Sequence, residues 1–104
     1  MIKYEITNIT SNLRRIRALR NIPRHNVKAG DLGGFVESED NLSQKGDAWV
    51  TDEARVYEDA RVYNEAKVSG KAWVFGNASV YGEARVFESQ TKYVKFVVFP
   101  VLSW

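Results

Sequence analysis

The amino-acid sequence predicts an all-β protein whose short strands form a β-solenoid, and two regularities within residues 47–89 carry this prediction. An alanine returns every six residues, and a valine follows each alanine two places later. The alanines are Ala48, Ala54, Ala60, Ala66, Ala72, Ala78 and Ala84, and the valines are Val50, Val56, Val62, Val68, Val74, Val80 and Val86. A short fixed period of this kind indicates a repeat architecture.

The six-residue period favours short strands joined by corners over a helix. Residues six apart lie about 240° apart around a helix, so the valines would scatter over its surface. In a strand, residues two apart point to the same side, so each alanine shares a face with its valine. The next three residues would turn a corner, and their middle member needs to tolerate positive φ, as Gly and Asn do. These middle residues are Asp52, Glu58, Asn64, Gly70, Gly76 and Gly82.

Segments such as VFGNAS and VSGKAW are similar to the hexapeptide repeat of left-handed parallel β-helices. This resemblance implies that three hexapeptides make one triangular coil, so that residues about 18 apart stack. The six-residue frame extends from 30 to 88 and covers about three coils. The expected fold is therefore a left-handed parallel β-helix of about three triangular coils, with an N-terminal cap and a C-terminal β-strand.

One domain with three parts is expected: an N-terminal cap (1–29), the hexapeptide repeat (30–88) and an apolar C-terminal strand (89–104). A cap is needed because an open end coil exposes unpaired strand edges. KYEIT alternates like a strand, and for NLRRIRALR we favour a strand over a helix because Ile16 and Ala18 share one strand face.

Residues 30–47 are interpreted as a degenerate first coil, which is expected of a terminal repeat. Stepping back by six from Val50 puts Leu32 in a valine position, while Ser38 and Gln44 break the aliphatic rule. The same step from the alanines puts Val36 and Leu42 in alanine positions.

The segment 89–104 leaves the six-residue frame and is rich in β-formers. Its two faces are both apolar, which implies burial on both sides. One side would pack on the last coil, and we expect a second copy of the chain to cover the other. The residues expected to form this homodimer are Tyr93, Phe96, Val98, Phe99 and Trp104.

An 18-residue stacking period brings aromatic residues together. Tyr57 would lie below Phe75 with Tyr93 as the next member, Tyr63 below Tyr81, and Arg55 below Trp73. Such ladders stabilise neighbouring strands by a few tenths of a kcal/mol. The alternative is a binding surface, since exposed Tyr and Trp beside Arg are typical of interface anchors. On that interpretation the partner-binding residues are Tyr57, Tyr63, Trp73, Phe75, Tyr81, Glu58 and Glu65.

The charges are divided between the two ends of the chain. Residues 1–30 hold seven Lys/Arg and one acid, whereas residues 31–88 hold six bases and twelve acids. The acidic body favours a basic partner. Nucleic acid is not the expected partner, because the basic segment 14–28 contains no aromatic residue for base stacking and neighbours the acidic body.

Composition also limits the location of the protein. The chain has no cysteine, so disulfides and thiolate metal sites are excluded. No apolar run approaches the roughly 20 residues that cross a bilayer, and the N-terminus lacks the apolar stretch of a signal peptide. We expect a cytoplasmic protein with no membrane partner.

No constellation of residues points to catalysis. Hexapeptide acyltransferases resemble one another in using a histidine base between subunits, whereas the single histidine here, His25, precedes the coils in a basic loop where a surface position is expected. One histidine cannot build the three-histidine metal site of carbonic-anhydrase-like β-helices, and GDLGG lacks the Lys-Ser/Thr of a P-loop. We expect a non-enzyme without metal or cofactor.

A second resemblance is more specific than the repeat. Arg15–Leu19 (RIRAL) and Lys28–Ser43 (KAGDLGGFVESEDNLS), followed by G-x-A-x-V units, are similar to the start of YdcK-like small β-helix proteins of enterobacteria and their phages. The match runs from Arg15 to about Glu88, and the C-terminal run departs from it. The resemblance implies a left-handed β-helix in a phage or prophage setting, with the host cytoplasm as its location.

Three function classes remain. The first is a non-enzymatic phage-type protein that binds and inhibits a host protein complex, such as a bacterial defence system, as anti-CRISPR proteins do. The second is a self-assembling structural β-helix module. The third is a small-ligand or nucleotide binder, or a degenerate acyltransferase.

Overall fold

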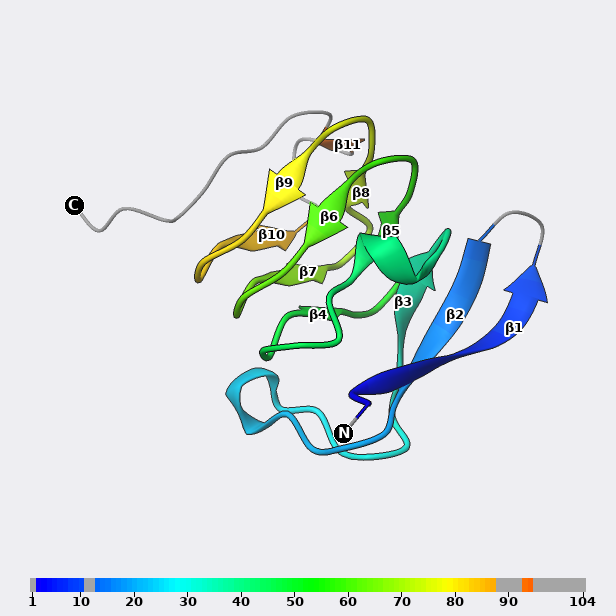
Figure 1. Cartoon of the computed structure of the whole chain (residues 1–104), viewed down its shortest axis with the longest axis vertical. Helices are drawn as coiled ribbons and strands as arrows, with labels where there is room; N and C mark the ends of the chain where they lie inside the picture. Colours follow the sequence, from blue (N-terminus) through cyan, green and yellow to red (C-terminus); the bar gives the residue numbers. More distant parts are fainter. Residues whose placement is uncertain (1, 11–12, 88–92, 95–104) are drawn as a thin grey trace.

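The computed structural model describes residues 2–10, 13–87 and 93–94, which form strands and two 3₁₀ turns with no α-helix among them. The all-β prediction is confirmed (Figure 1). The strands are β1 (Tyr4–Thr10), β2 (Leu13–Ala18), β3 (Leu32–Val36), β4 (Trp49–Val50), β5 (Arg55–Val56), β6 (Arg61–Val62), β7 (Lys67–Ser69), β8 (Trp73–Val74), β9 (Ser79–Val80), β10 (Arg85–Phe87) and β11 (Tyr93–Val94), and the 3₁₀ turns are η1 (Pro23–His25) and η2 (Glu39–Asn41).

The strands are arranged in three sheets, and the repeat strands pair in parallel within each sheet. One sheet has the order β1-β2-β3-β5-β8-β11, the second β10-β7-β4 and the third β6-β9. Val56 pairs with Val74, Val62 with Val80 and Val68 with Val86, so partners lie 74 − 56 = 18 residues apart. Figure 1 shows the result for the second sheet, where β4, β7 and β10 lie one above another. The 18-residue register predicted from the hexapeptide frame is confirmed for these strands.

The alanines and valines of the repeat fill the core between the three sheets. All seven alanines are fully buried, and the valines are buried as well, with Val86 the most exposed at 8%. Each buried valine contributes about 1.5–3 kcal/mol relative to an exposed one.

The corners between the strands have the backbone conformation that the sequence predicts. The middle residue of all six corners has positive φ, between 59° at Asp52 and Glu58 and 68° at Gly76. Along the chain, the first three of these corner residues are Asp52, Glu58 and Asn64, and the last three are Gly70, Gly76 and Gly82.

The side chains of the first three corner residues accept hydrogen bonds from the backbone amides of the three corner glycines. The side chain of Glu58 accepts a hydrogen bond from the Gly76 amide at 2.8 Å. Asp52 and Asn64 accept from the Gly70 and Gly82 amides at 3.0 and 3.1 Å. Each of these bonds joins residues 18 apart, so the corners reinforce the same register as the strands.

The first unit of the repeat has a different register, which corrects the predicted frame. Val36 pairs with Val56 and Leu42 with Val62, so the offset here is 56 − 36 = 20 residues. Trp49 already pairs with Lys67 at 67 − 49 = 18, so the two extra residues lie between Leu42 and Trp49. Val36 and Leu42 therefore occupy valine positions, and their prediction as alanine-position residues is wrong.

In this unit, the side chains of two polar residues form hydrogen bonds with backbone groups of neighbouring segments. Asn41 is fully buried, and its amide nitrogen donates to the carbonyls of Glu58 and Ala60 at 3.1 and 2.8 Å. Gln44 lies in the two-residue insertion and uses its amide against β1: it accepts from the Tyr4 backbone N–H at 3.2 Å and donates to the Tyr4 carbonyl at 3.2 Å. The Gln44 side chain thus pairs with Tyr4 as a neighbouring strand would.

Gly34 shows why glycine is needed where this first unit meets the repeat. A Cβ on Gly34 would lie 2.7 Å from the Ala54 carbonyl oxygen and 2.7 Å from a methyl group of Val50. Real Cβ atoms do not come this close to backbone, so the approach of β3 to the next unit depends on the missing side chain.

The N-terminal segment forms an antiparallel hairpin that extends the largest sheet. β1 pairs with β2, and β2 pairs with β3 through Arg14↔Val36 and Arg15↔Phe35. The strand predicted for residues around Ile16 is confirmed, and Ile16 and Ala18 are both buried as its inward face. Below the repeat, Tyr4 donates its hydroxyl proton to the Leu42 carbonyl at 2.6 Å.

At the other end of the same sheet, β11 pairs in parallel with β8. Tyr93 lies opposite Trp73 and Val94 opposite Val74. The prediction that Tyr93 continues the Tyr57–Phe75 column is wrong, because the register here is again 20 residues rather than 18.

No helix in the described part of the chain is long and apolar enough to cross a membrane.

Candidate interaction surface

Two pairs of aromatic rings stack at two neighbouring corners. Tyr57 and Phe75 have ring centroids 5.4 Å apart and planes 10° apart. Tyr63 and Tyr81 are 5.2 Å apart with planes at 7°. Each of these residues directly follows an inward-pointing valine, so its side chain points outward, and the 18-residue register puts the two members of each pair together. All four rings are half-buried.

These two stacks border the sheet formed by β6 and β9. Tyr57 precedes the corner that leads into β6, and Tyr63 directly follows β6. Between them lie the outward side chains of Arg61 and Ser79, which are cross-strand neighbours. We call this surface the β6–β9 face, and it consists of Tyr57, Arg61, Tyr63, Phe75, Ser79 and Tyr81.

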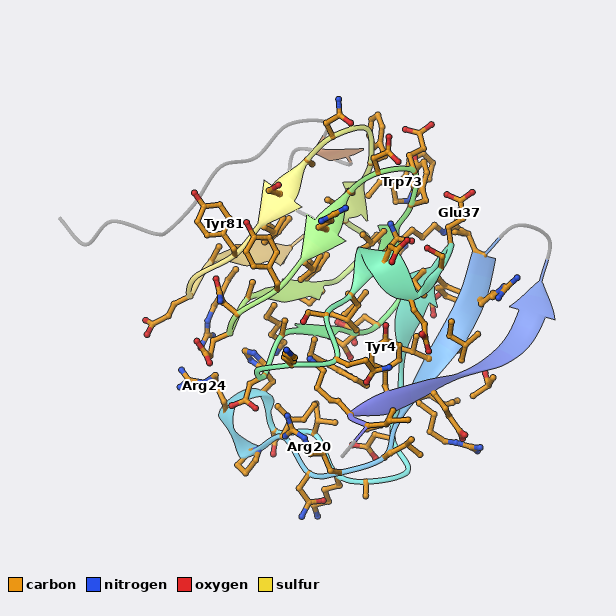
Figure 2. The ribbon with its side chains drawn as sticks, in the orientation of Figure 1. Tyr4, Arg20, Arg24, Glu37, Trp73 and Tyr81 are labelled. Carbon is orange, nitrogen blue, oxygen red and sulfur yellow. The ribbon has the colours of Figure 1, made fainter. Side chains whose placement is uncertain are left out.

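Trp73 does not belong to the β6–β9 face. It lies on the outer side of the six-stranded sheet, where the Arg55 guanidinium lies 5.5 Å from its ring centroid. Figure 2 shows Trp73 and Tyr81 on opposite sides of β6 and β9. The sequence-predicted set of partner-binding residues therefore divides between two surfaces.

The two acids of that set differ in their roles. Glu58 accepts a backbone hydrogen bond from Gly76 and has positive φ, so its side chain is held at the corner. Glu65 follows Tyr63 at the other corner, where its carbonyl oxygen lies 3.0 Å from His25 Nε2. Partial burial, followed by the nearby Glu58 carboxylate, raises the pKa of Tyr57 above its usual value.

His25 is buried, although its position in a basic loop predicts a surface residue. Only 6% of it is exposed, and Nε2 contacts the Glu65 carbonyl. Because a carbonyl only accepts, Nε2 must carry the proton. Burial lowers the pKa of His25, and Lys67, Arg85 and Arg24 act in the same direction. The ring thus fastens η1 to a corner of the repeat.

Three further residues at this junction were not singled out by the sequence. Lys3 is fully buried, and its Nζ donates to the Ala48 carbonyl at 2.6 Å. Trp49 is also fully buried and meets Tyr4 edge-on, with ring centroids 6.4 Å apart. Arg20 forms an ion pair with Asp47 at 3.3 Å. The repeat pattern carries no signal for these contacts, because they depend on how the N-terminal segment folds back over the first unit.

No group of three His, Cys, Asp or Glu side chains within residues 2–10, 13–87 and 93–94 could hold a metal ion. Of the residues predicted to self-associate, Tyr93 lies in β11, while Phe96, Val98, Phe99 and Trp104 lie outside the described residues.

Comparisons with known proteins gave no match: no family model, no curated protein and no solved structure is similar to this chain.

Proposed function

We propose that this protein is a non-enzymatic interaction module of phage type, which binds a host protein through the β6–β9 face and inhibits the complex to which that protein belongs. The scaffold in this proposal is a left-handed parallel β-helix. Its support is the 18-residue pairing of the three sheets together with positive φ at each corner between Thr51 and Glu83. The host setting is supported by the resemblance of residues 15–50 to YdcK-like proteins, and the proposed location is the host cytoplasm.

The observation that carries the proposal is the pair of ring stacks on either side of β6 and β9. The core of the repeat is already filled by alanine and valine, so the four rings are not needed to complete it. Half-buried tyrosines held rigidly by stacking bind a partner at low entropic cost and supply both apolar area and a hydroxyl group. Rigid aromatic anchors on both borders of one face are typical of a protein contact surface.

The centre of the face indicates the chemistry of the partner. Arg61 is exposed and forms no ion pair within the part of the chain that the structure describes. A carboxylate of the partner would form an ion pair with Arg61, because an arginine donates two parallel hydrogen bonds to such a group. The proposed partner therefore presents an apolar surface with a central acid.

Quantitative affinity capture from an enterobacterial lysate tests this function. Wild-type protein is compared with Tyr63→Ser/Tyr81→Ser, and Arg85→Ala, on the sheet formed by β10, β7 and β4, is the control. We expect one host complex to be recovered with the wild type and the control and to fall at least tenfold with the double variant. The double variant should stay folded, because both rings are half-buried and lie outside the alanine and valine core. Equal recovery by all three proteins would contradict the proposal.

Self-association through the C-terminal strand is the second candidate. β11 is the last strand of the six-stranded sheet, and none of the other described strands pairs with its outer edge. Such an edge can pair with the same edge of a second copy. Light scattering over a range of concentrations should show a dimer, and Phe96→Asp should dissociate it. A monomer at every concentration would exclude this candidate.

A further inference from the structure

Residues 22–27, in the connection between β2 and β3, form a small loop that is closed on itself and contains η1. An antiparallel bridge joins its two ends: the Ile22 amide donates to the Val27 carbonyl at 2.8 Å, and the Val27 amide donates to the Ile22 carbonyl at 3.1 Å. Inside the loop, Asn26 has a φ of 61° and donates its amide to the Pro23 carbonyl at 3.0 Å. We call residues 22–27 the η1 loop, and because these bonds are internal, it can move as one unit.

Two polar contacts attach the η1 loop to the repeat within the part of the chain that the structure describes. Arg24 Nε lies 3.6 Å from a carboxylate oxygen of Asp47, and both side chains are partly exposed, so solvent weakens this ion pair. His25 Nε2 donates to the Glu65 carbonyl at 3.0 Å, and the residue is only 6% exposed. The His25 contact is therefore the stronger of the two, because it is shielded from water.

The surroundings of His25 suit the neutral ring but not the protonated one. Because the Glu65 carbonyl requires a proton on Nε2, the neutral ring has no proton on Nδ1. The Nδ1 atom is buried and has no hydrogen-bond partner among the described residues. A proton added to Nδ1 would thus produce a charged N–H group without an acceptor, which is costly in the interior of a protein.

The charged groups around the ring also oppose its protonation. The cations that face His25 are Arg24 from the η1 loop itself, Lys67 from β7 and Arg85 from β10. Of the acids in this region, Glu65 contacts the ring through its backbone carbonyl, and Asp47 is already paired with Arg20 and Arg24. Burial, and then these cations, keep the pKa of His25 below its usual value of 6.5, against the opposing effect of the Glu65 hydrogen bond.

We infer that protonation of His25 releases the η1 loop from the repeat, so that this loop is an acid-sensitive element of the N-terminal cap. In the released loop both ring N–H groups donate to water, and the buried Ile22 and Val27 become exposed. The docked loop is favoured at neutral pH, and this preference is lost as the pH falls, because the released ring binds the proton more tightly. The release involves no residue of the β6–β9 face, so it does not depend on the function proposed above.

Methyl NMR of the intact protein, with a soluble paramagnetic probe, tests this inference. The probe broadens the signals of groups in contact with solvent, so it reports directly on the exposure of Ile22 and Val27. Between about pH 7.5 and about pH 4.5, a range that spans the usual histidine pKa, we expect the relaxation enhancement of both residues to rise by about threefold or more. The buried Val74 on β8 should show no change. The His25 ring signals should titrate with the same midpoint as the methyl signals, below 6.5.

A variant that keeps the hydrogen-bond donor but cannot gain the proton isolates the cause. His25→Gln can still donate to the Glu65 carbonyl, so Ile22 and Val27 should stay buried across the whole pH range. Lys28→Gln, at an exposed basic position just outside the loop, is the matched control and should retain the wild-type response. Thermal unfolding at both ends of the range verifies that each protein is folded.

Three results would each overturn the inference. The first is a His25 ring that stays neutral throughout the range, and the second is a ring that titrates while Ile22 and Val27 remain buried. The third is a His25→Gln variant that exposes these two residues with the same pH dependence as the wild type. If His25→Gln does not fold, the comparison of the two midpoints in the wild type still decides the question.

Discussion

Lys3 is an ammonium group held in the interior by a single carbonyl. Its Nζ donates to Ala48, and no carboxylate contacts it within the described residues. Burial, with a smaller contribution from Arg20, lowers the pKa of Lys3 to about 8 from its usual 10.5. The neutral amine can still donate the same hydrogen bond, so folding favours the loss of the proton.

This burial predicts an unusual pH dependence of stability. Between about pH 8 and 10 the unfolded chain holds the Lys3 proton and the folded chain does not, so the free energy of unfolding should rise with pH. The rise should be roughly 2 kcal/mol, at about 1.4 kcal/mol per pKa unit. Denaturant unfolding across this range measures it.

Two variants isolate the contribution of Lys3. Lys3→Met should abolish the rise, whereas Lys28→Met, at an exposed position, should retain it. Above pH 10 the opposite trend begins, because burial raises the pKa of Tyr4 and the unfolded state then releases its phenol proton first. The account of Lys3 fails if the Lys3→Met variant shows the same slope as the wild type.

Glu58 combines a strained backbone with a useful side chain. Its φ is 59°, which costs a non-glycine residue about 1–2 kcal/mol, while its carboxylate accepts the Gly76 amide at 2.8 Å. Glu58→Gly loses the hydrogen bond but relieves the strain, and Glu58→Ala loses the bond and keeps the strain. We predict that the Ala variant is less stable than the Gly variant by roughly 1 kcal/mol. Thermal and denaturant unfolding of the two variants measure the difference, and a more stable Ala variant would be inconsistent with this role.

At the scale of elements, the N-terminal hairpin depends on Gln44 for its attachment to the repeat. The Gln44 amide bonds both backbone groups of Tyr4 and also accepts from the Lys3 amide at 2.8 Å. We predict that Gln44→Leu lowers the free energy of unfolding by about 1–3 kcal/mol, because backbone groups lose partners near the core. Hydrogen exchange should show faster exchange at the amides of Lys3 and Tyr4, while Val74 on β8 exchanges as before. Unchanged protection of Lys3 and Tyr4 would exclude this role.

The regular units could be predicted from the sequence because each position of the six-residue repeat has its own residue types, and these indicate whether the position is buried or lies at a corner. Alanine and valine marked the inward positions, and Asp, Glu, Asn or Gly marked the corners, so the register of β4 to β10 followed. The two-residue insertion before Trp49 was missed because Val36 and Leu42 are aliphatic and suit either inward position. Gln44 looked like a failed core residue, whereas its amide pairs with the Tyr4 backbone, and a linear pattern cannot distinguish these roles.

The candidate surface was predictable only in part, for a related reason. The 18-residue register correctly paired Tyr57 with Phe75 and Tyr63 with Tyr81. It did not indicate that Trp73 faces a different side, because the sequence specifies neighbours along a column but not which columns share a face. The buried Lys3 and His25 depend on how the N-terminal segment folds over the first unit, and no repeat encodes that contact.

For the whole molecule, the structure separates what stabilises the fold from what remains at the surface. Alanines, valines and the corner hydrogen bonds hold the three sheets together. The two ring stacks lie outside this framework, on the β6–β9 face.

The most direct test of the central claim, that the β6–β9 face contacts a host protein, is site-specific photo-crosslinking in enterobacterial cells. A photo-reactive phenylalanine analogue replaces Ser79, at the centre of the face, and in a separate protein it replaces Arg85 on β10. The account predicts one dominant crosslinked host protein from position 79 and none from position 85. No crosslink at position 79, or the same products from both positions, would contradict it.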